Sequence, residues 1–362
     1  MTEVWLNRVG TAVPDHDVHQ TFVAYGRSIL KDPYTLDVFD RMTVLADIDH
    51  RYSFLNPAPA EDPSWIDFDG FYRRGRFPST RERMGLYEPQ AVRLAERATA
   101  DLRLTPPERD RVTHLIVASC TGFSAPGLDF QVMRALGLRS TVERTIVGFM
   151  GCFAAVVALR LARHIVRSEP DARVLVVNVE LSSLHLQADD TIEKVLSFLL
   201  FGDGGSAALV SADPVGLRLG AFRGAVIERT DDLITWHIGD TGFDMHLSGR
   251  VPGRIRRWLM DDEAEDGVAS LLGGRPADAI GWWAVHAGGR SILDAVQQGL
   301  RLAPAALRPS RDVLRACGNM SSTTLMFVLA RILAMPGGAA PRDGIAMAFG
   351  PGLSVESFGF SR

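Results

Sequence analysis

The sequence predicts an α/β fold with a largely parallel sheet, because short apolar runs alternate with longer amphipathic segments along most of the chain. At 362 residues, the chain has the length of two typical domains or of one large double-layered domain. The strand and helix order of residues 111–210 also returns in residues 280–349. These observations predict two related halves, which we place at residues 1–211 and 212–362.

Buried strands are expected in the first half wherever a short apolar run ends at a turn signal: 113–120, 145–149, 173–179 and 206–210. The last two have the continuous apolar character of parallel strands. Helices are expected between these strands: from Pro89 through Ala98, at 128–136, and from Gly151-Cys152 to about Arg167. Residues before Arg83 show the least regularity, and the prolines and arginines of residues 57–78 indicate a surface excursion.

The second half repeats this order, with a strand at 280–286, a helix at 291–300, a helix that Gly318-Asn319 opens, and a strand at 345–349. Cys120 and His286 are 166 residues apart, and Cys152 and Asn319 are 167 residues apart. Each half therefore places one polar residue at a strand end and another at a helix start. A pseudo-twofold relation between the halves would bring these four residues to one central site.

Composition excludes several classes of function. The net charge of −4 offers no basic excess for nucleic acid, and the longest strongly apolar run, residues 146–159, is too short for a membrane span. No secretory signal is evident, and three scattered cysteines are typical of free thiols in a reducing compartment, so we expect a cytoplasmic protein. No Cys-x-x-Cys pair is present and Asp203 is a single carboxylate in a turn, so no metal site is expected.

Cys152 is the strongest candidate nucleophile, because a thiol after glycine at a helix N-terminus feels the helix dipole, which favours the thiolate. His286 precedes a Gly-Gly turn that would expose its ring, and Asn319 follows Gly318. Each residue also has an ordinary structural reading, as a core cysteine, a core or surface histidine and a helix N-cap. Papain-like cysteine proteases share the order Cys, His, Asn and a similar separation between the cysteine and the histidine. The sequence context that surrounds their cysteine is absent here.

Several segments together resemble the type III polyketide synthases, the chalcone-synthase-like branch of the thiolase-fold condensing enzymes. They are Gly151-Cys-Phe-Ala-Ala155, Leu200-Phe-Gly-Asp-Gly204, His286-Ala-Gly-Gly289, Gly318-Asn-Met-Ser-Ser322 and Gly350-Pro-Gly-Leu-Ser-Val-Glu356. The segments Ser119-Cys-Thr-Gly-Phe123 and Gly242-Phe-Asp-Met-His-Leu-Ser248 look more like the bacterial members. The resemblance implies a thiolase-like fold, with two pseudo-twofold-related βα halves in a layered αβαβα arrangement, and a homodimer.

The resemblance also implies roles for single residues. Cys152 would take the acyl starter from coenzyme A and pair with His286, while His286 and Asn319 would stabilise the enolate formed when malonyl-CoA loses CO₂. Phe201 would be one of two gatekeeper residues, and the second, an aromatic residue in plant members, corresponds to Met245. Positions that shape the cavity correspond to Cys120, Ser182, His185, Trp236 and Ser321. Coenzyme A thioesters would be substrates, and no cofactor would be permanently bound.

Two departures limit what the resemblance implies. The lysines that plant members offer to the coenzyme A phosphates have no counterpart near Arg41, which is kept, and Lys31 and Lys194 are the only lysines in the sequence. Cys120 and His185 replace hydroxyl residues of the plant enzymes, so the product is expected to be a pyrone, resorcinol or related aromatic rather than a chalcone. Three alternatives stay open: a ketoacyl synthase III-type single condensation, a cysteine hydrolase, and a non-catalytic protein that only binds acyl chains.

Overall fold

Most strands of the chain lie in one continuous hydrogen-bonded array. The computed structural model describes residues 2–59, 61, 65–261, 267–336 and 342–362. In this part of the chain, nine strands pair in the order β11–β12–β13–β8–β1–β7–β6–β4–β5. Their bounds are β1 Trp5–Ala12, β4 His114–Ser119, β5 Glu143–Gly148, β6 Val174–Leu181, β7 Asp203–Ser211, β8 Leu217–Val226, β11 Trp282–Val285, β12 Asp343–Gly350 and β13 Ser354–Ser361.

The strand directions are mixed. β4 is parallel to β5 and β6, and β11 is parallel to β12. β7 pairs antiparallel with both β6 and β1, so the expectation of a parallel strand at 206–210 is wrong. The apolar run was nevertheless a correct sign of burial, because every residue of β7 is buried. A strand that is covered on both faces carries the same continuous apolar pattern in either direction.

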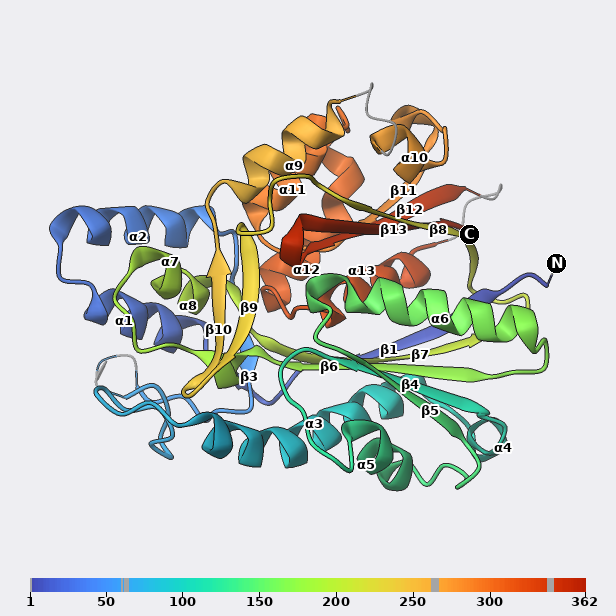
Figure 1. Ribbon diagram of the computed structural model, residues 1–362, viewed down its shortest axis with the longest axis horizontal. Helices are drawn as coiled ribbons and strands as arrows, with labels where there is room; N and C mark the ends of the chain where they lie inside the picture. Colours follow the sequence, from blue (N-terminus) through green and yellow to red (C-terminus); the bar gives the residue numbers. More distant parts are fainter. Residues whose placement is uncertain (1, 60, 62–64, 262–266, 337–341) are drawn as a thin grey trace.

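Helices form three layers with strands between them, which is the predicted αβαβα arrangement (Figure 1). One outer layer holds α3 (Thr80–Leu102) and α5 (Leu128–Ala135). The middle layer holds α6 (Ala154–Ser168) and α13 (Thr323–Ala334), and the other outer layer holds α9 (Val251–Leu259) and α11 (Arg290–Gly299). Further elements near these layers are β2 (His16–Asp17), β3 (Tyr52–Ser53), α4 (Pro106–Asp110), α10 (Val268–Leu272) and α12 (Arg308–Cys317).

The middle layer explains why the two halves of the chain meet closely. α6 buries Ala154, Ala155, Ala158 and Ala162, whose small side chains allow the helix to lie near the strands. One hydrophobic cluster joins α6 and α13 to strands of both halves, including Val176 of β6. The residues that begin these two helices therefore lie at the centre of the molecule.

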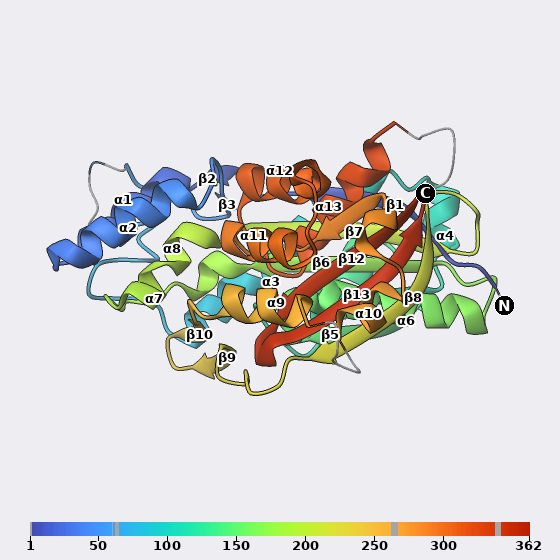
Figure 2. The ribbon, with the colours of Figure 1, turned by 90° about the horizontal axis from the view of Figure 1, so that it is seen from above.

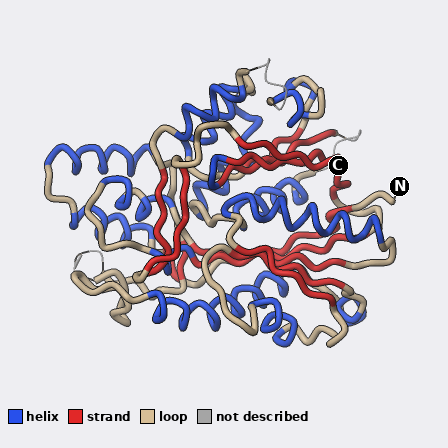
Figure 3. The backbone as a smooth tube through the Cα atoms, viewed as in Figure 1, coloured by secondary structure: helices blue, strands red, loops and turns tan. Residues whose placement is uncertain are grey.

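One end of the molecule lies outside these layers. It carries α1 (His19–Ile29), α2 (Pro33–Leu45), α7 (Ile192–Val195) and α8 (Ser197–Leu200), seen at the left of Figures 1 and 2. Beside them stands an antiparallel ribbon of β9 (Ile234–Gly239) and β10 (Gly242–Leu247), which is separate from the nine-stranded sheet (Figure 3). Within the described residues, no helix has the length and apolar character needed to cross a bilayer.

Candidate active site

Cys152 lies in a tight 3₁₀ turn, Gly151–Phe153, that leads into α6. Gly151 has a φ of +75°, and a Cβ at this position would lie 2.3 Å from Pro351 Cδ. Only glycine satisfies both conditions, because other residues rarely adopt this backbone conformation and none could avoid the proline ring. The Gly151-Cys152 segment of the first half and the Gly350-Pro351 segment of the second half therefore meet directly at Cys152, the candidate nucleophile.

Asn319 is held by the backbone of the other half. Its N–H donates to Leu200 O at 2.8 Å, and its carbonyl accepts from Gly202 N–H at 3.0 Å. Asn319 does not open the following helix as expected, because Ser322 is the N-cap of α13. The pairing with residues 200–202, which are distant in sequence, takes the place of a local helix cap.

A chain of hydrogen bonds runs from Cys152 to Gly288, two residues after His286. Ser321 Oγ donates to Cys152 Sγ at 3.8 Å, and the Ser321 N–H donates to Asn319 Oδ1 at 2.9 Å. Asn319 Nδ2 donates to Gly288 O at 3.1 Å. A Cβ at Gly288 would lie 3.4 Å from His286 Nε2 and 3.9 Å from Asn319 Nδ2, so these two side chains flank the same point. The three residues that the sequence singled out thus belong to one connected group.

The ring of His286 is buried, and neither of its nitrogens has a hydrogen-bond partner among the described residues. The expected pair between His286 and Cys152 is therefore not formed here and stays a prediction. Buried imidazole nitrogens are ordinarily satisfied, so the two unpaired nitrogens set His286 apart from a structural core histidine.

Burial controls the charges of this group. It raises the pKa of the Cys152 thiol to about 12, although the hydrogen bond from Ser321 lowers it in part. Burial also lowers the pKa of His286 to about 4. The position before a helix suggested a resting thiolate, whereas burial favours the protonated thiol. Near neutral pH the resting pair is a thiol and a neutral imidazole.

A cavity opens beside Cys152. Eight of the predicted site residues line it: Cys120, Cys152, Ser182, His185, Phe201, Trp236, Met245 and Ser321. His286 and Asn319 do not line this cavity. Arg41 is also outside it, exposed on α2 with an ion pair to Asp37 at 2.7 Å.

Several residues of the cavity wall were not identified as site residues from the sequence: Thr121, Leu186, Gln187, Ile234 and Pro351. Lys194 also lines the wall, although its only sequence signal was the scarcity of lysine. Pro351 and Thr121 lie in segments that carried the family resemblance, whereas Leu186, Gln187 and Ile234 do not. Their contribution depends on how the ribbon β9–β10 folds over the cavity, which no local pattern predicts.

Glu180, which is buried near the end of β6, was also not identified from the sequence. It accepts hydrogen bonds from Cys120 N–H at 3.0 Å, Thr121 Oγ at 3.1 Å and Ser322 Oγ at 2.5 Å. Burial raises the pKa of Glu180 to about 7, while these hydrogen bonds lower it. A charged residue in the apolar run of β6 was the signal that could have identified it.

Two residues of the cavity wall, Cys120 and His185, form hydrogen bonds that link the surroundings of Glu180 to neighbouring segments. The Gly151 N–H donates to Cys120 Sγ at 3.0 Å, so the second cysteine supports the turn that carries Cys152. His185 donates from Nε2 to Thr121 O at 2.8 Å and accepts at Nδ1 from Phe243 N–H at 3.0 Å. Burial lowers the pKa of His185 to about 3, so this ring is a neutral structural member of the wall.

Comparison with known proteins identifies the family. The model of the chalcone and stilbene synthases, N-terminal domain, matches residues 3–214, and the model of their C-terminal domain matches residues 221–361. The chain belongs to the chalcone and stilbene synthase family. It is therefore a type III polyketide synthase, an acyltransferase that builds its product through repeated condensations.

The chain is 35% identical over 320 residues to the alpha-pyrone synthesis polyketide synthase-like Pks18 of Mycobacterium tuberculosis, which covers 83% of this chain and 78% of that protein. It also resembles 1,3,6,8-tetrahydroxynaphthalene synthase from Streptomyces coelicolor A3(2), with a TM-score of 0.84, 27% identity and 99% of each chain covered. CsyB, solved in complex with CoA-SH, shares the fold with a TM-score of 0.84 at 22% identity, covering 99% of this chain and 100% of CsyB.

Proposed function

We propose that this polyketide synthase loads an acyl group from an acyl-CoA starter onto Cys152 and extends it with malonyl-CoA. Cyclisation then gives a pyrone, a resorcinol or a related aromatic. The hydrogen bonds that run from Cys152 through Ser321 and Asn319 to Gly288, two residues after His286, carry this proposal together with the adjoining cavity. The relative whose name includes alpha-pyrone synthesis makes a pyrone the first product to test.

In the loading step, the Cys152 sulfur attacks the thioester carbonyl of the starter and coenzyme A leaves as its thiol. The proton of Cys152 passes to the leaving sulfur, and the neutral ring of His286 is the group that can carry it. Because the resting thiol has a pKa of about 12, this proton moves only as the sulfur attacks. Acylation is therefore expected without a stable thiolate.

In the extension step, malonyl-CoA loses CO₂, and the resulting enolate attacks the acyl carbonyl on Cys152. A carbon–carbon bond forms, the bond to sulfur breaks, and the longer chain remains on coenzyme A until it returns to Cys152. The enolate oxygen needs donors in a buried place. Asn319 Nδ2 has a second hydrogen beyond the one given to Gly288 O, and His286 has an unpaired ring.

Residues 1–211 and 212–362 are proposed as the two functional halves, with Cys152 on the first and both His286 and Asn319 on the second. Acyl-CoA and malonyl-CoA are proposed as substrates, with no permanently bound cofactor. CsyB, of the same fold, binds CoA-SH. Arg41 on the exposed face of α2 is proposed as a contact for the coenzyme A phosphates. Three free cysteines fit a cytoplasmic enzyme.

A homodimer is also proposed, through the edge strand β5. β5 ends the nine-stranded order, and Ile146 on it is 44% exposed. Phe123 is 41% exposed and lies close to Gly148 of the same strand. An unpaired edge beside exposed apolar side chains is a surface that a second copy of the chain would cover.

Intact-protein mass spectrometry after incubation with acyl-CoA tests the nucleophile. Cys152→Ala is expected to carry no acyl group, while Cys317→Ala, a change at a half-buried cysteine outside the cavity, keeps it. Acyl transfer to the Cys152→Ala protein would overturn the proposal.

Release of ¹⁴CO₂ from labelled malonyl-CoA tests the second step. The His286→Ala/Asn319→Ala double variant is expected to lose it, and persistent release would contradict the assigned roles. Product masses then distinguish the alternatives: several extensions support iteration, and one extension indicates a ketoacyl synthase III-type reaction. Thioester or peptide cleavage without use of malonyl-CoA indicates a hydrolase.

A further inference from the structure

The ribbon β9–β10 supplies a large part of the cavity wall. Trp236 and Met245 are direct cross-strand partners, so their side chains lie on the same face, and both line the cavity together with Ile234. A two-stranded ribbon has little stability by itself. The shape of this part of the cavity wall therefore depends on the contacts that hold the ribbon in place.

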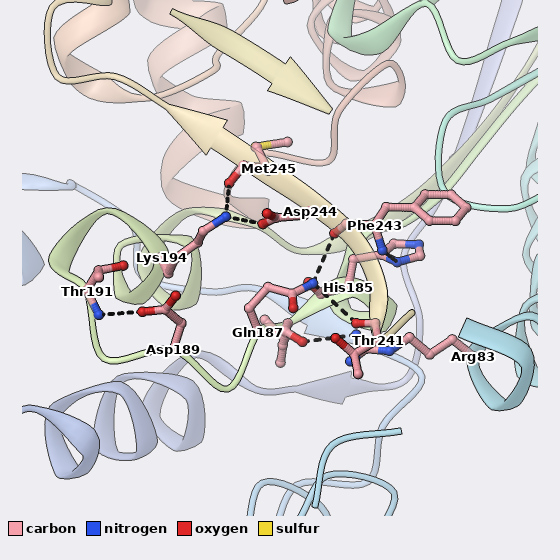
Figure 4. Close-up of polar contacts among 11 residues, drawn as sticks. Arg83, His185, Gln187, Asp189, Thr191, Lys194, Thr241, Phe243, Asp244 and Met245 are labelled. Carbon is pink, nitrogen blue, oxygen red and sulfur yellow. Dashed lines mark hydrogen bonds and ion pairs between the residues drawn. The ribbon is translucent and has the colours of Figure 1, made fainter. Parts of the chain in front are cut away.

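The segment between β6 and α8 holds one end of β10 (Figure 4). Gln187 Nε2 donates to Thr241 O at 3.3 Å and to Phe243 O at 3.1 Å. The ring of His185 stacks on Phe243 with centroids 4.2 Å apart and accepts from the Phe243 N–H at 3.0 Å. These contacts leave the Met245 end of the strand to be held by other groups.

Lys194 of α7 holds that second end. Its Nζ donates to Met245 O at 2.9 Å and forms an ion pair with the Asp244 carboxylate (Figure 4). The Lys194 side chain is only 18% exposed, and its stem lines the cavity. The turn before α7 is ordered as well, since Asp189 Oδ1 accepts from Thr191 N–H at 2.8 Å. The ammonium is thus directed at the ribbon rather than at the nucleophile.

We propose that Lys194 is a positioning residue that determines starter specificity, by fixing Met245 and its strand in the wall of the cavity. This inference rests on the proposed function, since it takes the cavity beside Cys152 as the place where the starter binds. Without the bond to Met245 O, the end of the ribbon moves outward and the flexible Met245 side chain follows it. The cavity widens there, and longer acyl chains are accepted more readily than before.

Competition between hexanoyl-CoA and lauroyl-CoA tests this role. In Lys194→Met, we expect the lauroyl to hexanoyl ratio of kcat/KM to rise by about tenfold, the lower end of the range by which a pocket distinguishes one methylene group. The change is expected in the KM for the starter, with the KM for malonyl-CoA unaltered. Lys31→Met is the matched control, since it makes the same change at the chain's other lysine, which is exposed. Lys194→Arg is expected to restore the original ratio.

Asp244→Asn provides a second variant at a side chain that is 54% exposed and tolerant of change. It is expected to shift the ratio in the same direction by a smaller factor, and the double variant Lys194→Met/Asp244→Asn is expected to show less than the product of the two shifts. An unchanged ratio in Lys194→Met and Asp244→Asn, with normal acylation of Cys152, would overturn this inference and leave the proposed function intact. Failure of the unaltered chain to acylate Cys152 would overturn both.

Discussion

Gly151 and Pro351 are in direct contact, and a Cβ at residue 151 would lie only 2.3 Å from Pro351 Cδ. The two residues come from different halves of the chain, and the first precedes the proposed nucleophile. Their contact places Cys152 where the second half supplies Ser321 at 3.8 Å. A small change in this contact should therefore affect stability and acylation together.

Gly151→Ala is expected to destabilise the protein by about 2 kcal/mol more than Gly75→Ala, since the extra methyl group meets a packed ring. Gly75 is the matched control, because its φ is +82° and a Cβ there would meet nothing within 4 Å. Urea unfolding measures the difference, and acylation of Cys152 should fall only in the first variant. Equal destabilisation of the two variants would show that the Pro351 contact is unimportant.

His185 predicts a pH dependence of stability. Burial lowers its pKa from 6.5 to about 3, so the unfolded chain binds more protons between these values. The stabilisation from the neutral buried ring is therefore full above pH 6.5 and is lost as the pH falls toward 3. His185→Gln keeps a donor and an acceptor without this titration. The advantage in unfolding free energy of the unaltered chain over this variant should shrink by about 2 kcal/mol between pH 7.5 and pH 5. A constant difference would show that His185 does not lose its proton on folding.

Glu180 is expected to restrain the reactivity of Cys152. Its negative charge contributes to the raised pKa of the thiol, and its own pKa of about 7 leaves it mostly ionised at pH 8. Glu180→Gln should therefore increase the alkylation rate of Cys152 by iodoacetamide at pH 8 by about threefold. Asp203→Asn removes another buried carboxylate, which is hydrogen-bonded to Ser183, and is expected to leave that rate unchanged. An equal effect of both substitutions would point to general loosening of the structure.

Ile146 offers a test of the homodimer. Ile146→Asp places a charge on the β5 edge and is expected to halve the mass found by sedimentation equilibrium. Val215→Asp is the control, since Val215 is 62% exposed in the turn before β8, away from that edge. A dimer that persists in Ile146→Asp would place the interface on another face.

Local patterns predicted the buried strands and the two central helices well, because each is a continuous apolar run or a regular amphipathic one. β4 occupies 114–119 where 113–120 was expected, and α5 occupies 128–135 where 128–136 was expected. The direction of β7 and the setting of Asn319 could not be predicted in this way. Both depend on partners far away in sequence, such as Leu200 for Asn319.

The ionisation of Cys152 illustrates the same limit. The glycine and the helix that follows are visible in the sequence, and they favour a thiolate. The surrounding core is visible only in the folded chain, and it raises the pKa to about 12. Gln187 and Lys194 were likewise missed as wall residues, since their importance arises from a ribbon that residues 234–247 form elsewhere in the chain.

The backbone pairing between Asn319 and residues 200–202 also makes the site observable without substrate. The amide hydrogens of Gly202 and Asn319 are bonded to carbonyls on the opposite strand of this small pairing, so they exchange with deuterium only when the two segments separate. Deuterium exchange at these two amides therefore reports whether the site is assembled. An inactive variant whose two amides stay protected lacks only a catalytic group. An inactive variant whose amides exchange rapidly has lost the backbone pairing that assembles the site.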